Sequence, residues 1–109
     1  MKFNKLVLVS VLVGFSSLAS AVTESPKGKI TGFYTGWAKD QVRVTIEGAA
    51  YTECNCQFKD GYITAESDNS GYKTHTSALL AAYMSGKSVS ITVEGCVEGR
   101  PRIWAVNIN

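Results

Sequence analysis

The amino-acid sequence predicts a small domain that is mostly β with one helix, in the order β-β-β-α-β-β. Three segments alternate apolar and polar residues with a period of two, as strands with one buried face do. Another segment spaces its apolar residues at intervals of three and four, as an amphipathic helix does. Turn-forming stretches such as Asp-Gly and "DNSG" separate these segments.

Two strands are expected before the first cysteines. Residues 30–37, "ITGFYTGW", are rich in β-branched and aromatic residues with interspersed glycines, which favours a strand with a bend. Residues 41–48, "QVRVTIEG", set Val42, Val44 and Ile46 against polar neighbours and predict a strand with one buried face. The preceding stretch "TESPKGK" is expected to be a polar lead-in.

A third strand and the helix are expected after the first cysteines. "YITAES" begins at Tyr62, directly after an Asp-Gly turn, and predicts a short strand. The period then changes, which predicts a helix that begins at Tyr72 and ends at Gly86, because glycine is a favourable C-cap. One side of this helix is expected to carry Tyr72, Thr76, Leu79, Leu80 and Tyr83, and the other side Lys73, Ser77 and Met84.

Two further strands are expected after the helix. "SVSITVEG", residues 88–95, alternates in the same way. "RIWAVNIN", residues 102–109, places Trp104, Val106 and Ile108 on one face, so we expect Trp104 to pack in the core. A five-stranded partly open barrel is the OB-fold, and we expect it with its helix between the third and fourth strands. A generic α+β sandwich is the alternative.

The N-terminus predicts a Sec signal peptide over residues 1–21. Lys2 and Lys5 precede the apolar run "LVLVSVLVGFSSL", and "ASA" follows it, which predicts cleavage after Ala21. A helix of 13 residues rises only about 20 Å, less than the roughly 30 Å of a bilayer core. We therefore expect one secreted or periplasmic domain, residues 22–109, without a stable membrane span after cleavage; a retained interfacial anchor is the alternative.

The charge balance argues against polyanionic partners. The chain has 11 basic and 9 acidic residues, and loss of Lys2 and Lys5 leaves nine of each sign. Binding to nucleic acid or to an anionic membrane needs clustered lysine or arginine, and the sequence has no basic run. We therefore expect neither partner.

The three cysteines, Cys54, Cys56 and Cys96, predict one disulfide. A domain of this size in an oxidising compartment gains much of its stability from a bridge, so Cys96 should pair with Cys54 or with Cys56. A Cys54–Cys56 bond would close a very small, strained ring. A zinc site that adds His75 lacks the usual two-residue spacers, so no metal or other cofactor is expected.

The sequence offers little for catalysis. His75 is the only histidine, and no serine or cysteine nucleophile has a recognisable partner near it. A histidine at the edge of a helix is usually a partly packed polar residue. We therefore expect a protein without enzymatic activity.

Residues 72–96, "YKTHTSALLAAYMSGKSVSITVEGC", resemble small secreted bacterial proteins similar to the B subunits of subtilase-cytotoxin and pertussis-type toxins. In that group a helix leads through "SGK" into an alternating strand that ends in a cysteine. The resemblance covers about residues 29–108 and implies an OB-fold domain that binds glycans and assembles into a homo-oligomeric ring. It also implies a disulfide between Cys56 and Cys96, which leaves Cys54 as a free thiol.

The loops of an OB-fold suggest where a ligand would bind. The loops between strands one and two and between strands four and five converge, and here they read "GWAKD" and "VEGRPR". An aromatic ring beside such polar groups suits an oligosaccharide or a charged sugar. The alternative is that the tryptophan plugs the barrel and the arginines are solvated. The candidate ligand-binding residues are Trp37, Lys39, Asp40, Arg100 and Arg102, with Glu98 nearby.

Two functions of different classes follow from the sequence. The first is a secreted, non-catalytic domain that binds a cell-surface glycan in the manner of a toxin B subunit. The second is a monomeric or dimeric protein-interaction module that binds no sugar. A closed ring would favour the first, because several weak sites on one ring gain avidity.

Overall fold

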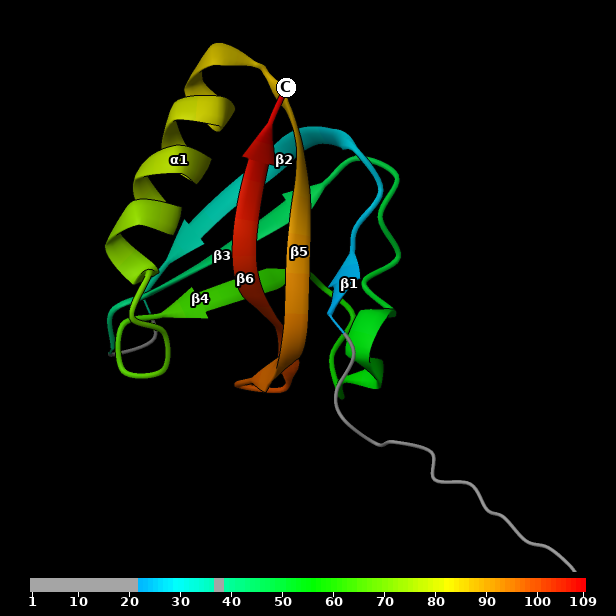
Figure 1. The fold of residues 1–109 in the computed structure, drawn as a ribbon, viewed down its shortest axis with the longest axis vertical. Helices are drawn as coiled ribbons and strands as arrows, with labels where there is room; N and C mark the ends of the chain where they lie inside the picture. The colour runs from blue at the N-terminus through cyan, green and yellow to red at the C-terminus, as the bar shows by residue number, and fades with distance from the viewer. Residues whose placement is uncertain (1–21, 37–38) are drawn as a thin grey trace, which may run out of the picture.

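The computed structural model describes residues 22–36 and 39–109, and over these residues the chain is mostly β with a single α-helix. The predicted signal peptide and Trp37 lie outside the described residues. Figure 1 shows the helix lying along one side of the curved sheet. The elements are β1 (Thr23–Glu24), β2 (Gly28–Thr35), β3 (Gln41–Ile46), the 3₁₀ helix η1 (Glu53–Asn55), β4 (Tyr62–Ala65), α1 (Tyr72–Ser85), β5 (Ser88–Val97) and β6 (Arg100–Ile108).

The strands form a six-stranded sheet in the order β1-β5-β2-β3-β4-β6, and β5 also pairs with β6. All pairings are antiparallel except that of β4 with β6. The sheet therefore curls back on itself, but it is not a clean barrel. The β4–β6 pairing is a single pair, Ile63 with Arg102, and β2 meets β5 only at Gly28 and Lys29.

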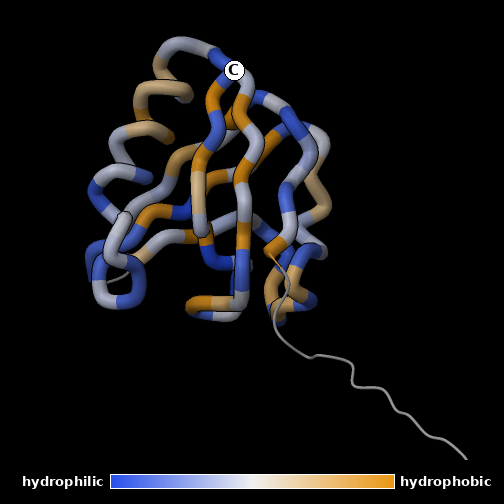
Figure 2. The backbone as a smooth tube through the Cα atoms, viewed as in Figure 1, coloured by the Kyte–Doolittle hydropathy of each residue, from blue (hydrophilic) through white to orange (hydrophobic). Residues whose placement is uncertain are grey.

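Burial confirms the alternation predicted for two of the strands, and Figure 2 colours each of their residues by its hydropathy. The apolar residues of β3 are buried, as are Val89, Ile91 and Val93 of β5, whereas their polar neighbours are more exposed along most of each strand. Two buried residues of α1 cover this core from the side. The cluster contains Ile30, Val42, Val44, Ile46, Tyr62, Leu79, Ala82, Val89, Ile91, Val93 and Ile103.

The helix begins and ends where the sequence predicts, but its buried face is narrower than expected. Gly86 adopts the left-handed conformation with φ of 69°, as a glycine C-cap does. Leu79 is fully buried, whereas Leu80 and Tyr83, predicted on the same stripe, are 45% and 40% exposed. The stripe prediction is therefore wrong for these two residues, because α1 lies against the side of the sheet and buries only the strip that faces it.

The prediction that Trp104 packs in the core is wrong. Thr92 of β5 lies opposite Ala105, but the next residue, Val93, lies opposite Ile103, so Trp104 has no partner across the ladder. This β-bulge shifts the alternation by one residue. Ile103 is consequently fully buried, and Trp104 is 54% exposed.

The predicted lead-in contains a short strand that the sequence pattern does not reveal. β1 pairs with β5, and Ser25, just beyond β1, exchanges two further hydrogen bonds with Ile91. The Ser25 backbone N–H donates to the Ile91 carbonyl at 2.8 Å, and the Ser25 hydroxyl accepts from the Ile91 N–H at 2.8 Å. These contacts attach the first described residues to β5.

A disulfide joins Cys56 to Cys96, which confirms the pairing implied by the resemblance to toxin B subunits, and Cys54 is a free cysteine. The bridge connects the segment after η1 to the end of β5. Cys56 and Cys96 are bonded to each other, so they do not serve as zinc ligands in this state. The described part of the chain holds no group of three or more His, Cys, Asp or Glu side chains suited to a metal.

Candidate functional site

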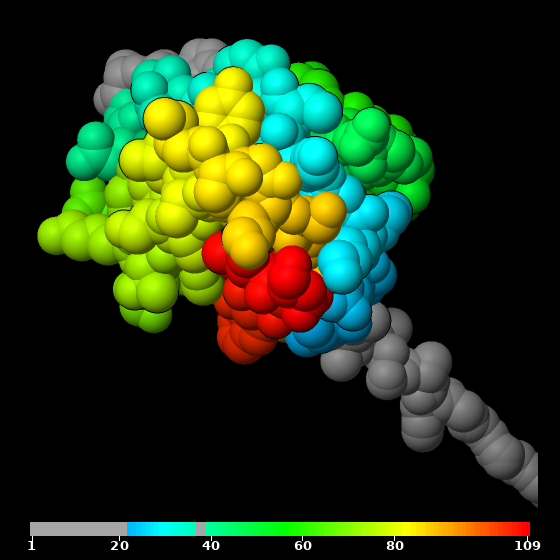
Figure 3. Space-filling model, turned by 90° about the horizontal axis from the view of Figure 1, so that it is seen from above, coloured from blue at the N-terminus to red at the C-terminus, as the bar shows by residue number. Residues whose placement is uncertain are grey.

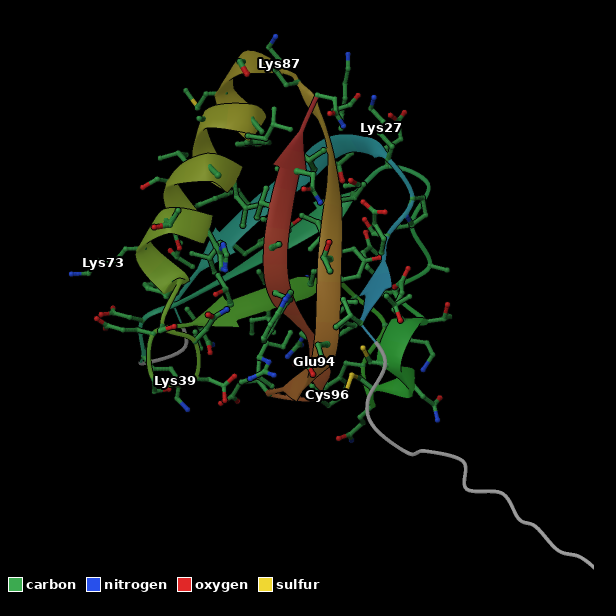
Figure 4. The ribbon with its side chains drawn as sticks, in the orientation of Figure 1. Lys27, Lys39, Lys73, Lys87, Glu94 and Cys96 are labelled. Atoms are coloured by element: carbon green, nitrogen blue, oxygen red, sulfur yellow. A yellow bond between two sulfur atoms is a disulfide. The ribbon has the colours of Figure 1, made fainter. Side chains whose placement is uncertain are left out.

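The two loops predicted to converge meet at an ion pair. Lys39 Nζ lies 2.8 Å from Glu98 Oε2, and this contact holds the pKa of Glu98 below its ordinary value. Asp40 does not join this pair; its backbone carbonyl accepts a hydrogen bond from the Glu66 N–H at 2.9 Å. Figure 4 labels Lys39 at the end of the molecule that carries these loops.

Arg100 is held by a neighbouring carboxylate. Its Nε and Nη2 donate to the two carboxylate oxygens of Asp60 at 2.6 and 3.0 Å, and Nη1 donates to the Glu98 carbonyl at 3.1 Å. The guanidinium carbon lies 4.9 Å from the Phe58 ring centroid. The Arg100 hydrogen bond lowers the pKa of Asp60, which keeps the pair charged over a wide pH range. A ligand would have to compete with Asp60 for this guanidinium.

Arg102 is engaged in a similar way. Its Nη2 and Nη1 pair with Glu94 at 2.9 Å and with Asp68 at 3.3 Å, and its Nε donates to the Glu94 carbonyl at 3.1 Å. The guanidinium carbon lies 6.0 Å from the Trp104 ring centroid. Arg102 therefore ties β5 and the segment before α1 together beside the Trp104 ring.

An open hollow lies beside Trp104. It has a volume of about 330 Å³ and is bounded by β6, by the segment before α1 and by the first turn of α1. Trp104 forms one wall and is 54% exposed. We call this site the Trp104 hollow, and its lining residues are Asn69, Ser70, Gly71, His75 and Trp104.

Asn69 fixes the shape of the Trp104 hollow. Its Nδ2 donates to the Ile103 carbonyl at 2.7 Å, next to Trp104, and its Oδ1 accepts from the Gly71 N–H at 2.9 Å. Both the nitrogen and the oxygen of the side-chain amide therefore form structural hydrogen bonds, which hold the turn before α1 against β6. Gly71 leaves room for the imidazole, because a Cβ at this position would lie 2.7 Å from His75 Nε2.

His75 is a neutral hydrogen-bonding group at neutral pH. Burial lowers the pKa of its imidazole, and a hydrogen bond to the Trp104 backbone carbonyl partly offsets that shift. A neutral imidazole has one donor nitrogen and one acceptor nitrogen. His75 thus links α1 to β6 and adds a polar edge to the Trp104 hollow.

The hollow combines a flat apolar surface with hydroxyl and imidazole groups, which suits a ligand with one apolar face and several hydroxyls. Sequence reasoning placed the ligand elsewhere and assigned Trp104 to the core. The stretch "NSGYKTH" held a usable signal, because a turn directly before a helix brings a polar loop and a first-turn histidine together.

No family model matches the chain, and no curated protein gives a significant match. The relation to toxin B subunits therefore stays a prediction. Among the described residues, no helix has the length and apolar character needed to span a bilayer.

Proposed function

We propose that this chain is a secreted, non-catalytic binding domain and that its ligand is a glycan, one sugar ring of which binds in the Trp104 hollow. The observation that carries this proposal is the half-exposed indole of Trp104 beside His75 and Ser70. An indole face packs well against the apolar face of a sugar ring. The imidazole and the Ser70 hydroxyl supply hydrogen bonds to the sugar's hydroxyls.

The size of the hollow supports a small ligand. Its volume of about 330 Å³ lies at the lower end of the roughly 300–1,000 Å³ that is usual for ligand pockets. The hollow therefore suits one ring of a glycan, while the rest of the chain of sugars extends into solvent. Binding at one such site is weak, and several copies in a ring would strengthen it through avidity.

The strand pairings support an OB-like architecture for this domain. The pairings run from β5 through β2, β3, β4 and β6 back to β5, with β4 parallel to β6 and the helix between β4 and β5. OB-folds bind oligosaccharides and oligonucleotides, although a fold alone does not fix a function. The balanced charge of residues 22–109 favours the oligosaccharide.

Secretion is the second part of the proposal. The predicted signal peptide of residues 1–21 would deliver the domain to an oxidising compartment, and the Cys56–Cys96 disulfide is compatible with one. A glycan on a cell surface is accessible to a protein in that compartment.

A protein-interaction module is the second candidate, and the outer surface of α1 favours it. Leu80, Tyr83 and Met84 are 45%, 40% and 76% exposed, and Ile108 at the end of β6 is 41% exposed. Figure 3 shows the end of α1 beside the C-terminal residues on one face. Exposed apolar residues that gather in this way are typical of contacts between proteins.

A glycan array probed with the secreted protein and two variants tests the proposal. Trp104→Ala should reduce binding at least tenfold without unfolding the domain, because the removed ring is half exposed. Met84→Ala is the matched control, since it removes an exposed apolar side chain from α1 and should leave sugar binding unchanged. Equal binding by wild type and Trp104→Ala would refute the proposal, whereas loss of binding in Met84→Ala would favour a site on α1.

A further inference from the structure

The Cys56–Cys96 bridge lies beside the backbone of Cys54, where the segment around η1 meets the end of β5. The sulfurs of Cys56 and Cys96 form the bridge, and they lie 3.9 and 3.8 Å from the backbone oxygen of Cys54. Cys56 Sγ is 3.7 Å from the Gly95 carbonyl, and the thiol of Cys54 contacts the backbone of the same glycine. The free thiol and the bridge therefore share their neighbours; Figure 4 labels Cys96 at this place.

The backbone explains why Cys54 and Cys56 both face β5. Cys54 and Asn55 have φ values of 65° and 51°, a left-handed conformation that residues other than glycine rarely adopt. Two such residues in succession turn the chain tightly. The side chains on either side of Asn55 consequently approach Gly95 together.

We propose that these three cysteines form a thiol–disulfide exchange site, in which Cys54 displaces Cys56 as the partner of Cys96. The Cys54 thiolate attacks Cys96 Sγ, and a Cys54–Cys96 bond forms as the Cys56–Cys96 bond breaks. The electron pair of the broken bond stays on Cys56 Sγ, which takes up a proton in place of the one that Cys54 released. The exchange consumes no oxidant and no reductant.

The two bridged forms are nearly equivalent in loop entropy. The sequence separation is 40 for Cys56 and Cys96 and 42 for Cys54 and Cys96. Closure entropy changes only slowly with loop length, so it favours neither form. The accessibility of the free thiol does change, because Cys56 is 4% exposed and Cys54 is half-buried. Exchange would therefore withdraw an accessible thiol from reaction with other chains.

The groups around Cys54 make the exchange slow at neutral pH. Burial raises the pKa of the Cys54 thiol, and the charges of Glu53 on η1 and Glu94 on β5 act in the same direction. The Gly95 backbone and Arg102 on β6 oppose them. Because the thiolate is the attacking species, the rate should rise with pH.

A thiol count in the Cys56→Ser variant tests the proposal. The secreted variant is denatured without reductant, alkylated with iodoacetamide and weighed intact. We expect no alkylated cysteine, because Cys54 should form the bridge with Cys96. The Cys54→Ser variant is the matched control and should also show none. Two alkylated cysteines in Cys56→Ser would overturn the proposal.

A second measurement on the wild-type protein does not depend on the folding of a variant. The protein is incubated at pH 6 or pH 9, returned to pH 6, denatured and labelled with N-ethylmaleimide. Fragmentation of the peptide that holds both Cys54 and Cys56 then shows which one carries the label. We expect label on Cys54 at pH 6 and partial transfer to Cys56 after pH 9. Label confined to Cys54 in both samples would overturn the proposal.

Discussion

Removal of the Cys56–Cys96 bridge should cost this domain much of its stability. The bridge spans 40 residues, and in the chain-entropy model a loop of that length contributes about 4 kcal/mol at 25 °C. Small domains have a total stability of roughly 5–15 kcal/mol. At about 4–8 °C per kcal/mol, Cys96→Ser should lower the melting temperature by roughly 15–30 °C.

Urea unfolding followed by far-ultraviolet circular dichroism measures this loss directly. The matched control is Cys54→Ser, which keeps the bridge and should change the free energy of unfolding by about 0.5 kcal/mol or less. Reductant should bring the wild-type protein to the stability of Cys96→Ser and should leave that variant unchanged. A loss below about 1 kcal/mol in Cys96→Ser, or an equal loss in both variants, would refute the entropic argument.

Three further measurements test the packing, the hollow and its histidine. Leu79→Ala should reduce the free energy of unfolding by about 2–5 kcal/mol, because this side chain is fully buried. Leu80→Ala, on the exposed side of the same helix, should reduce it by only about 0.5 kcal/mol. Equal losses in chemical denaturation would contradict the observed burial. Asn69→Ala should reduce the free energy of unfolding by about 1–3 kcal/mol, because it leaves the Ile103 carbonyl without its hydrogen-bond donor. Asn107→Ala, which loses one exposed contact, is the control in the same assay. Folding lowers the pKa of His75, so as the pH falls below about 6.5 the unfolded chain takes up a proton before the folded chain does, and the stability of the fold should decrease. In a pH series of melting curves, His75→Gln should remove the contribution of this residue to the dependence of stability on pH.

Much of the architecture could be predicted because the relevant signals are local. Val42, Val44 and Ile46 alternate with polar residues, and the β3–β4 pairing has no register shift, so the period-two rule holds from Val42 to Ile46. The end of α1 was predictable for a similar reason, since a helix C-cap often requires the left-handed conformation and Gly86 adopts it without help from distant residues. Such signals need no knowledge of distant residues.

The candidate site could not be predicted, because it depends on contacts between distant parts of the chain. The exposure of Trp104 follows from a bulge in the pairing of β5 with β6, and nothing in "RIWAVNIN" indicates that irregularity. The pairing of Arg100 with Asp60 likewise joins residues that are 40 positions apart. A sequence read one segment at a time assigns these arginines to a ligand, whereas the folded chain matches them with its own carboxylates.

The bulge at Trp104 makes the two candidate ligand sites differ in how readily a ligand can bind. At the loop end, Lys39, Arg100 and Arg102 are each matched by a carboxylate, so a ligand there must replace an interaction that already exists. At the Trp104 hollow, by contrast, the indole face is half exposed, and a ligand can cover it without replacing an ion pair. Full burial of a large apolar side chain stabilises a domain by about 1.5–3 kcal/mol. Because the bulge turns the indole of Trp104 outward and leaves it 54% exposed, about half of that stabilisation is lost. A sugar ring that covers the indole would recover this burial without breaking an ion pair, which is why binding should depend more on Trp104 than on either arginine.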